Sequence, residues 1–200
     1  MQQKILETAR ELFNQKGIQN TTIRDIASTL SLSDGHVRYY FKTKEILLLA
    51  VFKQLNAQIL KWSKVMDPKQ SVLENLQISL ENAYVTMYQY SFFFVESLQS
   101  LQQYPLLFAA YTTLVNERKV MLKEVFTGFK QNNIFKAEVT EEELNTLFEL
   151  FFIVSEGWIR FGHLQNKAFT KQDIAHYSRI TLELFDPYFS SKVKSKRWLN

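Results

Sequence analysis

Residues that interrupt helices are scarce in this chain. Its 200 residues include only five glycines and three prolines, and apolar side chains recur at helical spacing over long stretches. No stretch shows the alternation of apolar and polar residues that is typical of a half-buried strand. The prolines, at positions 68, 105 and 187, fall where the helical pattern begins or ends, as their fixed φ and missing N–H require. The sequence therefore predicts an all-α fold.

Three short helices are predicted at the start of the chain. The first covers residues 3–15, and Gly17 is placed to end it. The second begins after Thr22, whose hydroxyl can cap it while Asp25 serves as the capping-box partner three residues on. Ser33 can cap the third, which ends near residue 41.

Longer helices follow. Thr43 can cap a fourth helix over residues 44–64, which would be about 30 Å long. The segment "KVMDPKQS" then interrupts the pattern and marks a boundary. The later helices are predicted over residues 72–90, 92–103, 106–132, 141–166 and 171–185. We expect three parts: a small domain of residues 1–47, a helical bundle of residues 48–189, and a basic tail of residues 190–200.

Composition favours an ordinary globular protein of the cell interior. With 46% hydrophobic residues, the chain can bury one sizeable core or two modest ones. It has no cysteine, which excludes disulfides, thiolate zinc sites and cysteine nucleophiles. The N-terminal "MQQKILETAR" is charged and amphipathic rather than an apolar signal segment, and the most apolar run, residues 144–159, is interrupted by Glu149 and Glu156. We expect no membrane association and a cytoplasmic location.

The net charge of +4 comes from the C-terminal tail. Four of the 24 basic residues, Lys192, Lys194, Lys196 and Arg197, lie in the tail, which has no acidic residue, so the other 20 balance the 20 acidic residues. A short basic terminus is more often a solvated end than a DNA-binding arm.

No pattern in the sequence is typical of an enzyme. The three histidines, at positions 36, 163 and 176, share no i, i+3 or i, i+4 spacing that would suit a metal. The sequence contains neither a glycine-rich phosphate loop nor a G-x-S-x-G nucleophile turn. The acidic run at residues 141–143 lies in the first turn of a predicted helix, where the helix dipole favours negative charge. We therefore predict no catalytic activity, no metal and no cofactor.

Residues 22–41 are a candidate helix-turn-helix. Two short helices are joined by a tight turn, and the small Ala27 lies where the second helix must approach. In this motif the second helix enters the major groove of DNA. Phe41 would pack in the core, and core packing is also an alternative for Tyr39. The residues that can contact the phosphate backbone are Thr22, Arg38, Tyr39, Tyr40 and Lys44, and those that can face base edges are Asp34, Gly35 and His36.

The stretch "TTIRDIASTLSLSDGHVRYYFKTKEILLLAV", residues 21–51, resembles the DNA-binding domain of TetR-family transcriptional regulators. It shares their Thr-capped helix, the "DIA" sequence, a Ser-capped recognition helix, the aromatic "YYF" and a Lys that begins the fourth helix. The resemblance covers about residues 3–55. It implies an all-helical, Ω-shaped homodimer, generally a repressor, whose larger domain binds a small ligand and thereby releases DNA. By position, it implies DNA contacts at Thr22, Ser33, Gly35, His36, Tyr39, Tyr40 and Lys44.

Two residues depart from the family's usual pattern. Asp34 stands where many members have a basic or polar residue; a phosphate would repel it, but cytosine N4 could donate a hydrogen bond to it. Arg38 stands where many have Tyr, which keeps attraction for phosphate and adds bidentate capacity. An operator preference that differs from the usual one is expected.

Aromatic side chains are concentrated in the predicted bundle. Aromatic residues at helical spacing usually pack in cores, but the resemblance implies that some of them line a ligand cavity. We expect an apolar and aromatic cavity, lined by Tyr88, Phe92, Tyr111, Phe152, Trp158 and Phe161. Glu156 and Arg160 are most simply an i, i+4 ion pair, although they could orient a polar head group if they point inward.

The last two long helices resemble in position the pair that forms the family's dimer interface. Their apolar residues would be divided between the bundle core and a self-complementary patch. These residues are Leu147, Phe151, Val154, Trp158, Ile180 and Leu184.

The leading hypothesis is a dimeric repressor that binds a near-palindromic DNA operator and is released by a small apolar or aromatic effector. The alternative is an apolar-ligand carrier or helical interaction module that keeps the helix-turn-helix without reading DNA. Asp34 and the neutral charge of the chain outside its tail keep this alternative open.

Overall fold

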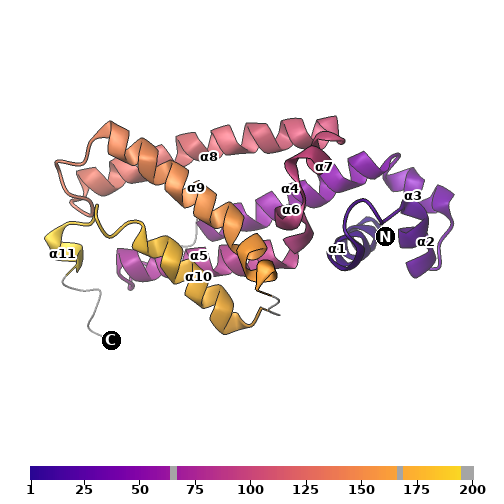
Figure 1. The fold of residues 1–200 in the computed structure, drawn as a ribbon, viewed down its shortest axis with the longest axis horizontal. Helices are drawn as coiled ribbons and strands as arrows, with labels where there is room; N and C mark the ends of the chain where they lie inside the picture. The colour runs from indigo at the N-terminus through magenta and orange to yellow at the C-terminus, as the bar shows by residue number, and fades with distance from the viewer. Residues whose placement is uncertain (64–66, 166–168, 195–200) are drawn as a thin grey trace. The chain divides into compact units, whose positions relative to one another are not determined.

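The computed structural model describes residues 1–63, 67–165 and 169–194 (Figure 1). In these ranges the chain is a series of helices joined by short loops, and its β-pairing is one isolated antiparallel bridge between Phe135 and Phe189. The predicted all-α class is confirmed. Residues 64 and 166, which were predicted to end two helices, and Lys196 and Arg197 of the predicted tail lie outside the described residues.

The chain forms two compact units, each built from segments that are distant in sequence. Unit 1 consists of Met1–Lys61 and Thr86–Thr113, and unit 2 consists of Trp62–Val85 and Leu114–Asn200. Two helices, α5 (Val72–Gln89) and α8 (Pro105–Gln131), contribute residues to both units. The first segment of unit 1 therefore completes its fold with a second segment from the middle of the chain.

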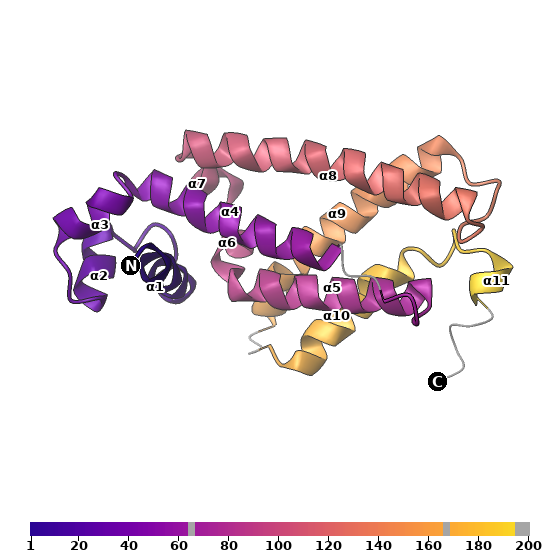
Figure 2. The ribbon, with the colours of Figure 1, turned by 180° about the vertical axis from the view of Figure 1, so that it is seen from behind.

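Unit 1 opens with four helices whose ends follow from local chemistry. They are α1 (Gln2–Lys16), α2 (Ile23–Thr29), α3 (Asp34–Tyr40) and α4 (Lys44–Ser63). Gly17 ends α1 with a φ of 78°, a conformation that glycine adopts without strain. The Thr43 hydroxyl oxygen accepts a hydrogen bond from the Ile46 N–H at 3.2 Å at the start of α4. The predicted end of α1 at Gly17 and the predicted cap of α4 at Thr43 are both confirmed. Figures 1 and 2 show α1, α2 and α3 next to the first turns of α4.

The core of these helices follows the predicted apolar spacing. Each helix contributes side chains that are at most 2% exposed, and burial of an aliphatic or aromatic side chain contributes about 1.5–3 kcal/mol. Phe41 is among them, as predicted, whereas Tyr39 is not. The fully packed set includes Ile5, Ala9, Phe13, Ile26, Val37, Phe41, Leu47 and Val51.

The prediction of one helix over residues 92–103 is wrong. Two five-residue helices, α6 (Ser91–Val95) and α7 (Leu98–Gln102), occupy this stretch. The backbone of Glu96 is extended, with ψ 149°, and the Ser97 hydroxyl oxygen accepts a hydrogen bond from the Ser100 N–H at 3.0 Å. A serine that caps a new helix offers the backbone an alternative to continuing the old one. The apolar spacing continues through the break, so periodicity alone could not reveal it.

Unit 2 is a helical bundle with an aromatic core. It contains the first part of α5, the second part of α8, and α9 (Glu141–Leu164), α10 (Lys171–Glu183) and α11 (Ser191–Lys194). Thr140 and Thr170 begin α9 and α10 with capping boxes, each completed by an acidic side chain three residues later. The buried cluster consists of Phe126, Phe135, Val139, Leu144, Leu147, Phe148, Leu182, Phe185 and Phe189.

Candidate nucleic-acid interface and effector-site residues

Helices α2 and α3 form a helix-turn-helix in unit 1. The turn between them passes through Ser31, whose φ of 55° lies in the left-handed region, and the Leu32 N–H donates to the Ala27 carbonyl at 2.8 Å. Ala27 is 1% exposed and Val37 of α3 is fully buried. The small side chain allows the close approach of the helices, and Val37 holds α3 against them. This order of elements is the one in which the second helix can enter a major groove.

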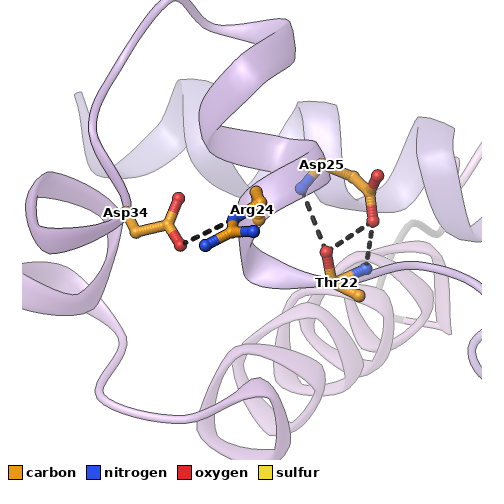
Figure 3. A network of polar contacts seen from close by, with 4 residues as sticks. All are labelled: Thr22, Arg24, Asp25 and Asp34. Carbon is orange, nitrogen blue, oxygen red and sulfur yellow. Dashed lines mark hydrogen bonds and ion pairs between the residues drawn. The ribbon is translucent and has the colours of Figure 1, made fainter.

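Thr22 and Asp25 fix the start of α2 by reciprocal hydrogen bonds (Figure 3). The Asp25 N–H donates to Thr22 Oγ1 at 3.1 Å, and the Thr22 N–H and hydroxyl donate to Asp25 Oδ2 at 2.7 and 2.6 Å. The bonds from the Thr22 hydroxyl and N–H hold the pKa of Asp25 below its usual value, because they favour the carboxylate. The predicted capping box is confirmed, and Thr22 remains exposed at the surface.

Helix α3 presents most of its side chains to solvent. The Ser33 hydroxyl oxygen accepts a hydrogen bond from the His36 N–H at 3.2 Å, as expected of its cap. Tyr39 is 82% exposed, and its ring meets the ring of Tyr40 edge-on at 5.2 Å. Arg38 is also exposed, and its Nη1 donates to the Lys42 carbonyl at 3.2 Å. Gly35 and His36 are exposed, whereas Asp34 and Tyr40 are half-buried.

Lys44 is directed into unit 1 rather than toward the exposed side chains of α3. Its ammonium donates a hydrogen bond to the Ile18 carbonyl and lies 5.8 Å from the centre of the Tyr104 ring. Burial lowers the pKa of Lys44, and the negative charges of Glu96 and Asp25 oppose that effect. Glu96 also accepts a hydrogen bond from the Ile18 N–H at 3.0 Å. The Lys44 and Glu96 side chains therefore bind both polar groups of the Ile18 backbone.

Further polar contacts join α1 and α4 to the second segment of unit 1. Asn14 makes three of them: its Nδ2 donates to the Gln89 carbonyl at 2.8 Å, and its Oδ1 accepts from the Ser91 hydroxyl at 3.1 Å and the Phe92 N–H at 3.0 Å. Sequence reasoning did not identify these contacts, because the partners are 75 to 78 positions apart and no local spacing connects them. Other contacts join Gln19 to Ser100 and Gln103, Glu45 to Leu106, and Gln58 to Tyr90.

Three of the six predicted effector-site residues belong to unit 1. Phe92 is 3% exposed, and its ring lies 5.2 Å from that of Phe13. The Tyr111 ring lies 5.5 Å from the ring of Phe93, and Tyr88 is half-buried. Phe92 and Tyr111 thus pack against the helices of unit 1.

The other three predicted effector-site residues belong to unit 2. Trp158 is 3% exposed; its ring stacks on Tyr84 at 4.9 Å and 3° and meets Phe169 edge-on at 5.3 Å. The indole N–H of Trp158 has no hydrogen-bond acceptor within the described residues. Phe152 is half-buried and Phe161 is 54% exposed. Trp158 is therefore the one of the three that lies deep in the bundle.

Tyr84 is a buried polar centre of unit 2 that sequence reasoning did not single out. Its hydroxyl oxygen lies 2.6 Å from Thr181 Oγ1 and 3.2 Å from Ser155 Oγ. Burial raises the pKa of Tyr84 to about 12, because a phenolate is poorly solvated there. A cavity of about 440 Å³ elsewhere in unit 2 is lined by residues 70–73, 132–134 and 192–193, and none of the six predicted effector-site residues lines it.

In the part of the chain that the structure describes, no helix is both long enough and apolar enough to cross a membrane. His, Asp and Glu side chains in the same ranges do not gather in groups of three that could hold a metal ion.

Comparison with known protein families gives two matches, which together cover most of the chain. Residues 5–51 match a family described as bacterial regulatory proteins, tetR family, and residues 54–196 match TetR, a bacterial transcriptional repressor family. The HTH-type transcriptional regulator QacR of Staphylococcus aureus is 28% identical over 179 residues, which cover 83% of this chain and 88% of QacR. The probable HTH-type transcriptional regulator YttP of Bacillus subtilis is 49% identical over 41 residues, 20% of each chain.

Solved structures show the same fold. A TetR-family transcriptional regulator from Marinobacter aquaeolei superposes with a TM-score of 0.83 at 22% identity, covering 98% of this chain and 94% of that one. The fatty acid degradation regulator FadR from Bacillus halodurans superposes with a TM-score of 0.73 at 16% identity, covering 92% and 93%. The resemblance that the sequence of residues 21–51 indicated is confirmed over most of the chain. This chain belongs to the TetR family of bacterial transcriptional regulators, which bind operator DNA as dimers and are not enzymes.

Proposed function

We propose that the protein is a repressor that binds a near-palindromic operator and leaves it when a small, largely apolar ligand binds the helical bundle. The observation that carries this proposal is the outward face of α3. Buried Val37 anchors the helix, while Arg38 and the strongly exposed Tyr39 project into solvent. A monomer has no evident use for an 82% exposed tyrosine beside an exposed arginine, but a phosphate backbone would bind both.

The proposed DNA contacts divide by chemistry. Arg38 would bind phosphate, and its hydrogen bond to the Lys42 carbonyl holds the guanidinium in one orientation. His36, in the first turn of α3, would face base edges together with Asp34 and Gly35. In a dimer, two copies of α3 would enter successive major grooves about 34–36 Å apart. The proposed phosphate contacts are Thr22, Ser33, Arg38, Tyr39 and Tyr40.

For Lys44 we propose a positioning role in place of a phosphate contact through its ammonium. The ammonium is bound to the Ile18 carbonyl, so a contact with phosphate would break that bond. Because only three residues separate Lys44, at the start of α4, from the end of α3, its hydrogen bond to Ile18 holds the end of α3 and the start of α4 to the loop between α1 and α2. Loss of Lys44 should therefore weaken DNA binding through a misplaced α3.

For dimerisation we propose the exposed apolar side of α9 with α10, the last two long helices. Leu150 and Ile153 are 41% and 66% exposed, and Phe161 and Leu164 are 54% and 78% exposed. Their positions fall within one broad helical face, and Ile180 of α10 is 37% exposed. Exposed apolar residues at this density are typical of a surface that a second subunit covers.

For the effector we propose a site in unit 2 around Trp158. Its buried indole N–H is left without an acceptor among the described residues, and such a group is unfavourable unless a partner arrives. The stacked rings of Trp158 and Tyr84 would suit an apolar or aromatic ligand that carries one acceptor. Two proteins of this fold are described as a fatty acid degradation regulator and a ketosteroid transcriptional regulator, at 16% and 18% identity.

The test is fluorescence anisotropy with labelled DNA from upstream of the protein's own gene. We expect saturable, salt-dependent binding that Arg38→Ala weakens by about tenfold, since a charge-assisted contact is lost. Lys53→Ala is the matched control, because it removes one exposed positive charge from α4 of the same unit. Equal effects of the two substitutions would refute the role of α3, and absence of binding would refute repression at that site.

A further inference from the structure

Arg24 and Asp34 form an ion pair across the helix-turn-helix (Figure 3). Arg24 lies in the first turn of α2, and Asp34 is the first residue of α3. Arg24 Nε is 3.6 Å from Asp34 Oδ2, and the two side chains are 85% and 40% exposed. The pair thus joins the leading ends of both helices on the open surface of the motif.

Stability does not explain this pair. An ion pair this exposed is screened by water and salt and loses side-chain entropy when it forms, so it contributes little to folding. The starts of α2 and α3 are already fixed by Thr22 and Ser33, whose side chains accept hydrogen bonds from backbone N–H groups. The charges of Arg24 and Asp34 are therefore available for a role in binding.

On DNA, the carboxylate of Asp34 needs a neutralising partner. A carboxylate at the start of the recognition helix would be repelled by the phosphates on both sides of the groove. Arg24 supplies the opposite charge beside it, and the other N–H groups of its guanidinium make no hydrogen bond within the described residues. The pair can therefore enter the groove with no net charge and still carry free donors.

A C·G base pair presents the groups that this pair can bind. Cytosine offers the N4 donor to a carboxylate, and guanine offers the O6 and N7 acceptors to a guanidinium. We propose that Arg24 and Asp34 are a specificity-determining pair: Asp34 accepts a hydrogen bond from cytosine N4, and Arg24 donates to the guanine of the same or the adjacent base pair. This inference rests on the proposed function, because it requires α3 to lie in the major groove.

The test begins with selection of the protein's preferred sites from double-stranded DNA of random sequence. We expect a C·G base pair at one symmetric position in each half-site. Anisotropy titrations then compare the selected site with variants in which each base pair is replaced in turn. Asp34→Ala should lose discrimination at that one position by about tenfold or more and keep it elsewhere.

The two side chains should also act as a unit. Arg24→Ala leaves the carboxylate unneutralised, so it should weaken binding to the selected site more in the wild-type background than in Asp34→Ala. Arg24→Lys keeps the charge but loses the forked donors, so it should recover affinity for DNA and only part of the base preference. Glu11→Ala is the matched control, because it removes an exposed carboxylate from α1 of the same unit.

Folding of each variant is checked by circular dichroism, and Asp34→Asn serves as a second variant that keeps the shape of the side chain. An unchanged base preference in Asp34→Ala and Asp34→Asn would overturn the inference. Additive effects of the Arg24→Ala and Asp34→Ala substitutions on the free energy of DNA binding would overturn it as well. In either case, selection of a palindromic site would leave the proposed function standing. Failure of the wild-type protein to enrich any sequence would overturn both.

Discussion

Asn14→Ala should destabilise unit 1 by about 1.5–3 kcal/mol. Three hydrogen bonds end on this side chain, at 2.8, 3.0 and 3.1 Å, and a net hydrogen bond contributes about 0.5–1.5 kcal/mol. Because Asn14 is exposed, each bond should contribute in the lower half of that range. Alanine leaves the Phe92 N–H and the Gln89 carbonyl without this partner, and water replaces it only in part.

Two other variants separate these bonds from a general effect of the substitution. Asn14→Asp keeps an acceptor for Ser91 and Phe92 but loses the donor to Gln89, so it should cost about 0.5–1 kcal/mol. Asn20→Ala is the matched control, because Asn20 donates a single hydrogen bond, to the carbonyl of Lys16 at the end of α1. It should cost about 0.5 kcal/mol.

Urea denaturation gives the change in unfolding free energy, and hydrogen exchange at the Phe92 amide shows where it arises. Asn14→Ala should speed that exchange more than Asn20→Ala does. Equal denaturation midpoints for the two alanine variants, with unchanged exchange at Phe92, would refute the claim that Asn14 holds the two segments of unit 1 together.

Three further outcomes are expected. Gly162→Ala should destabilise unit 2 by about 1–3 kcal/mol in urea denaturation, since an added Cβ would lie 2.0 Å from the Phe169 ring. Gly128→Ala, whose added Cβ would have nothing within 4 Å, should stabilise the protein by about 0.5–1 kcal/mol. Changes of the same sign in the unfolding free energy of the two variants would contradict this. Lys44→Met should lower the melting temperature and weaken binding to specific and random DNA alike, because the hydrogen bond to Ile18 is lost. Lys42→Met, which removes an exposed positive charge nearby, should leave the melting temperature unchanged. Equal melting temperatures of the two variants would argue against the positioning role of Lys44. The raised pKa of Tyr84 favours the neutral phenol in the folded state, so its contribution to stability is complete below pH 10 and is lost as the pH rises from 10 to about 12. Urea titrations on both sides of pH 10 should therefore show that Tyr84→Phe loses less unfolding free energy at alkaline pH than the wild-type protein does. Identical pH profiles of the two proteins would rule this out.

Local signals in the sequence predicted the helix-turn-helix well. The caps at Thr22, Ser33 and Thr43 each depend on residues three positions away, and the structure contains all three. Phe41, at the end of the third predicted helix, was expected in the core, and it is 2% exposed. Such features could be predicted because their causes lie within one or two turns of the chain.

Features with distant causes could not be predicted in this way. Lys44 was predicted to contact phosphate because it is basic and follows α3, but its hydrogen bond to the Ile18 carbonyl, 26 positions earlier, could not be predicted from local spacing. The contact of Glu96 is similar, because its carboxylate accepts a hydrogen bond from the Ile18 N–H 78 positions away, which no local spacing indicates. Periodicity shows which side of a helix is apolar but not which other segment it meets.

The predicted effector-site residues illustrate the same limit. Aromatic spacing could not separate Phe92, whose ring packs on α1 within unit 1, from Trp158, which lies deep in unit 2. Both are large, apolar and placed on helices, so their sequence contexts are alike. The indole N–H of Trp158, which has no acceptor among the residues that the structure describes, sets this side chain apart, and hydrogen-bond satisfaction is a property of the folded chain.

The composition of unit 1 has a consequence for exchanging DNA specificity between regulators. A chimera that takes only residues 1–61 would carry the helix-turn-helix without the 86–113 segment that belongs to the same unit. The grafted piece would then lack Glu96, which binds the Ile18 N–H, and the backbone groups of Gln89 and Phe92 that bind Asn14. The DNA-binding helices therefore do not form an independent N-terminal domain that can be transferred by itself. A transplant that preserves its stability needs two spliced pieces, with Asn14, Ile18 and Glu96 kept as a matched set.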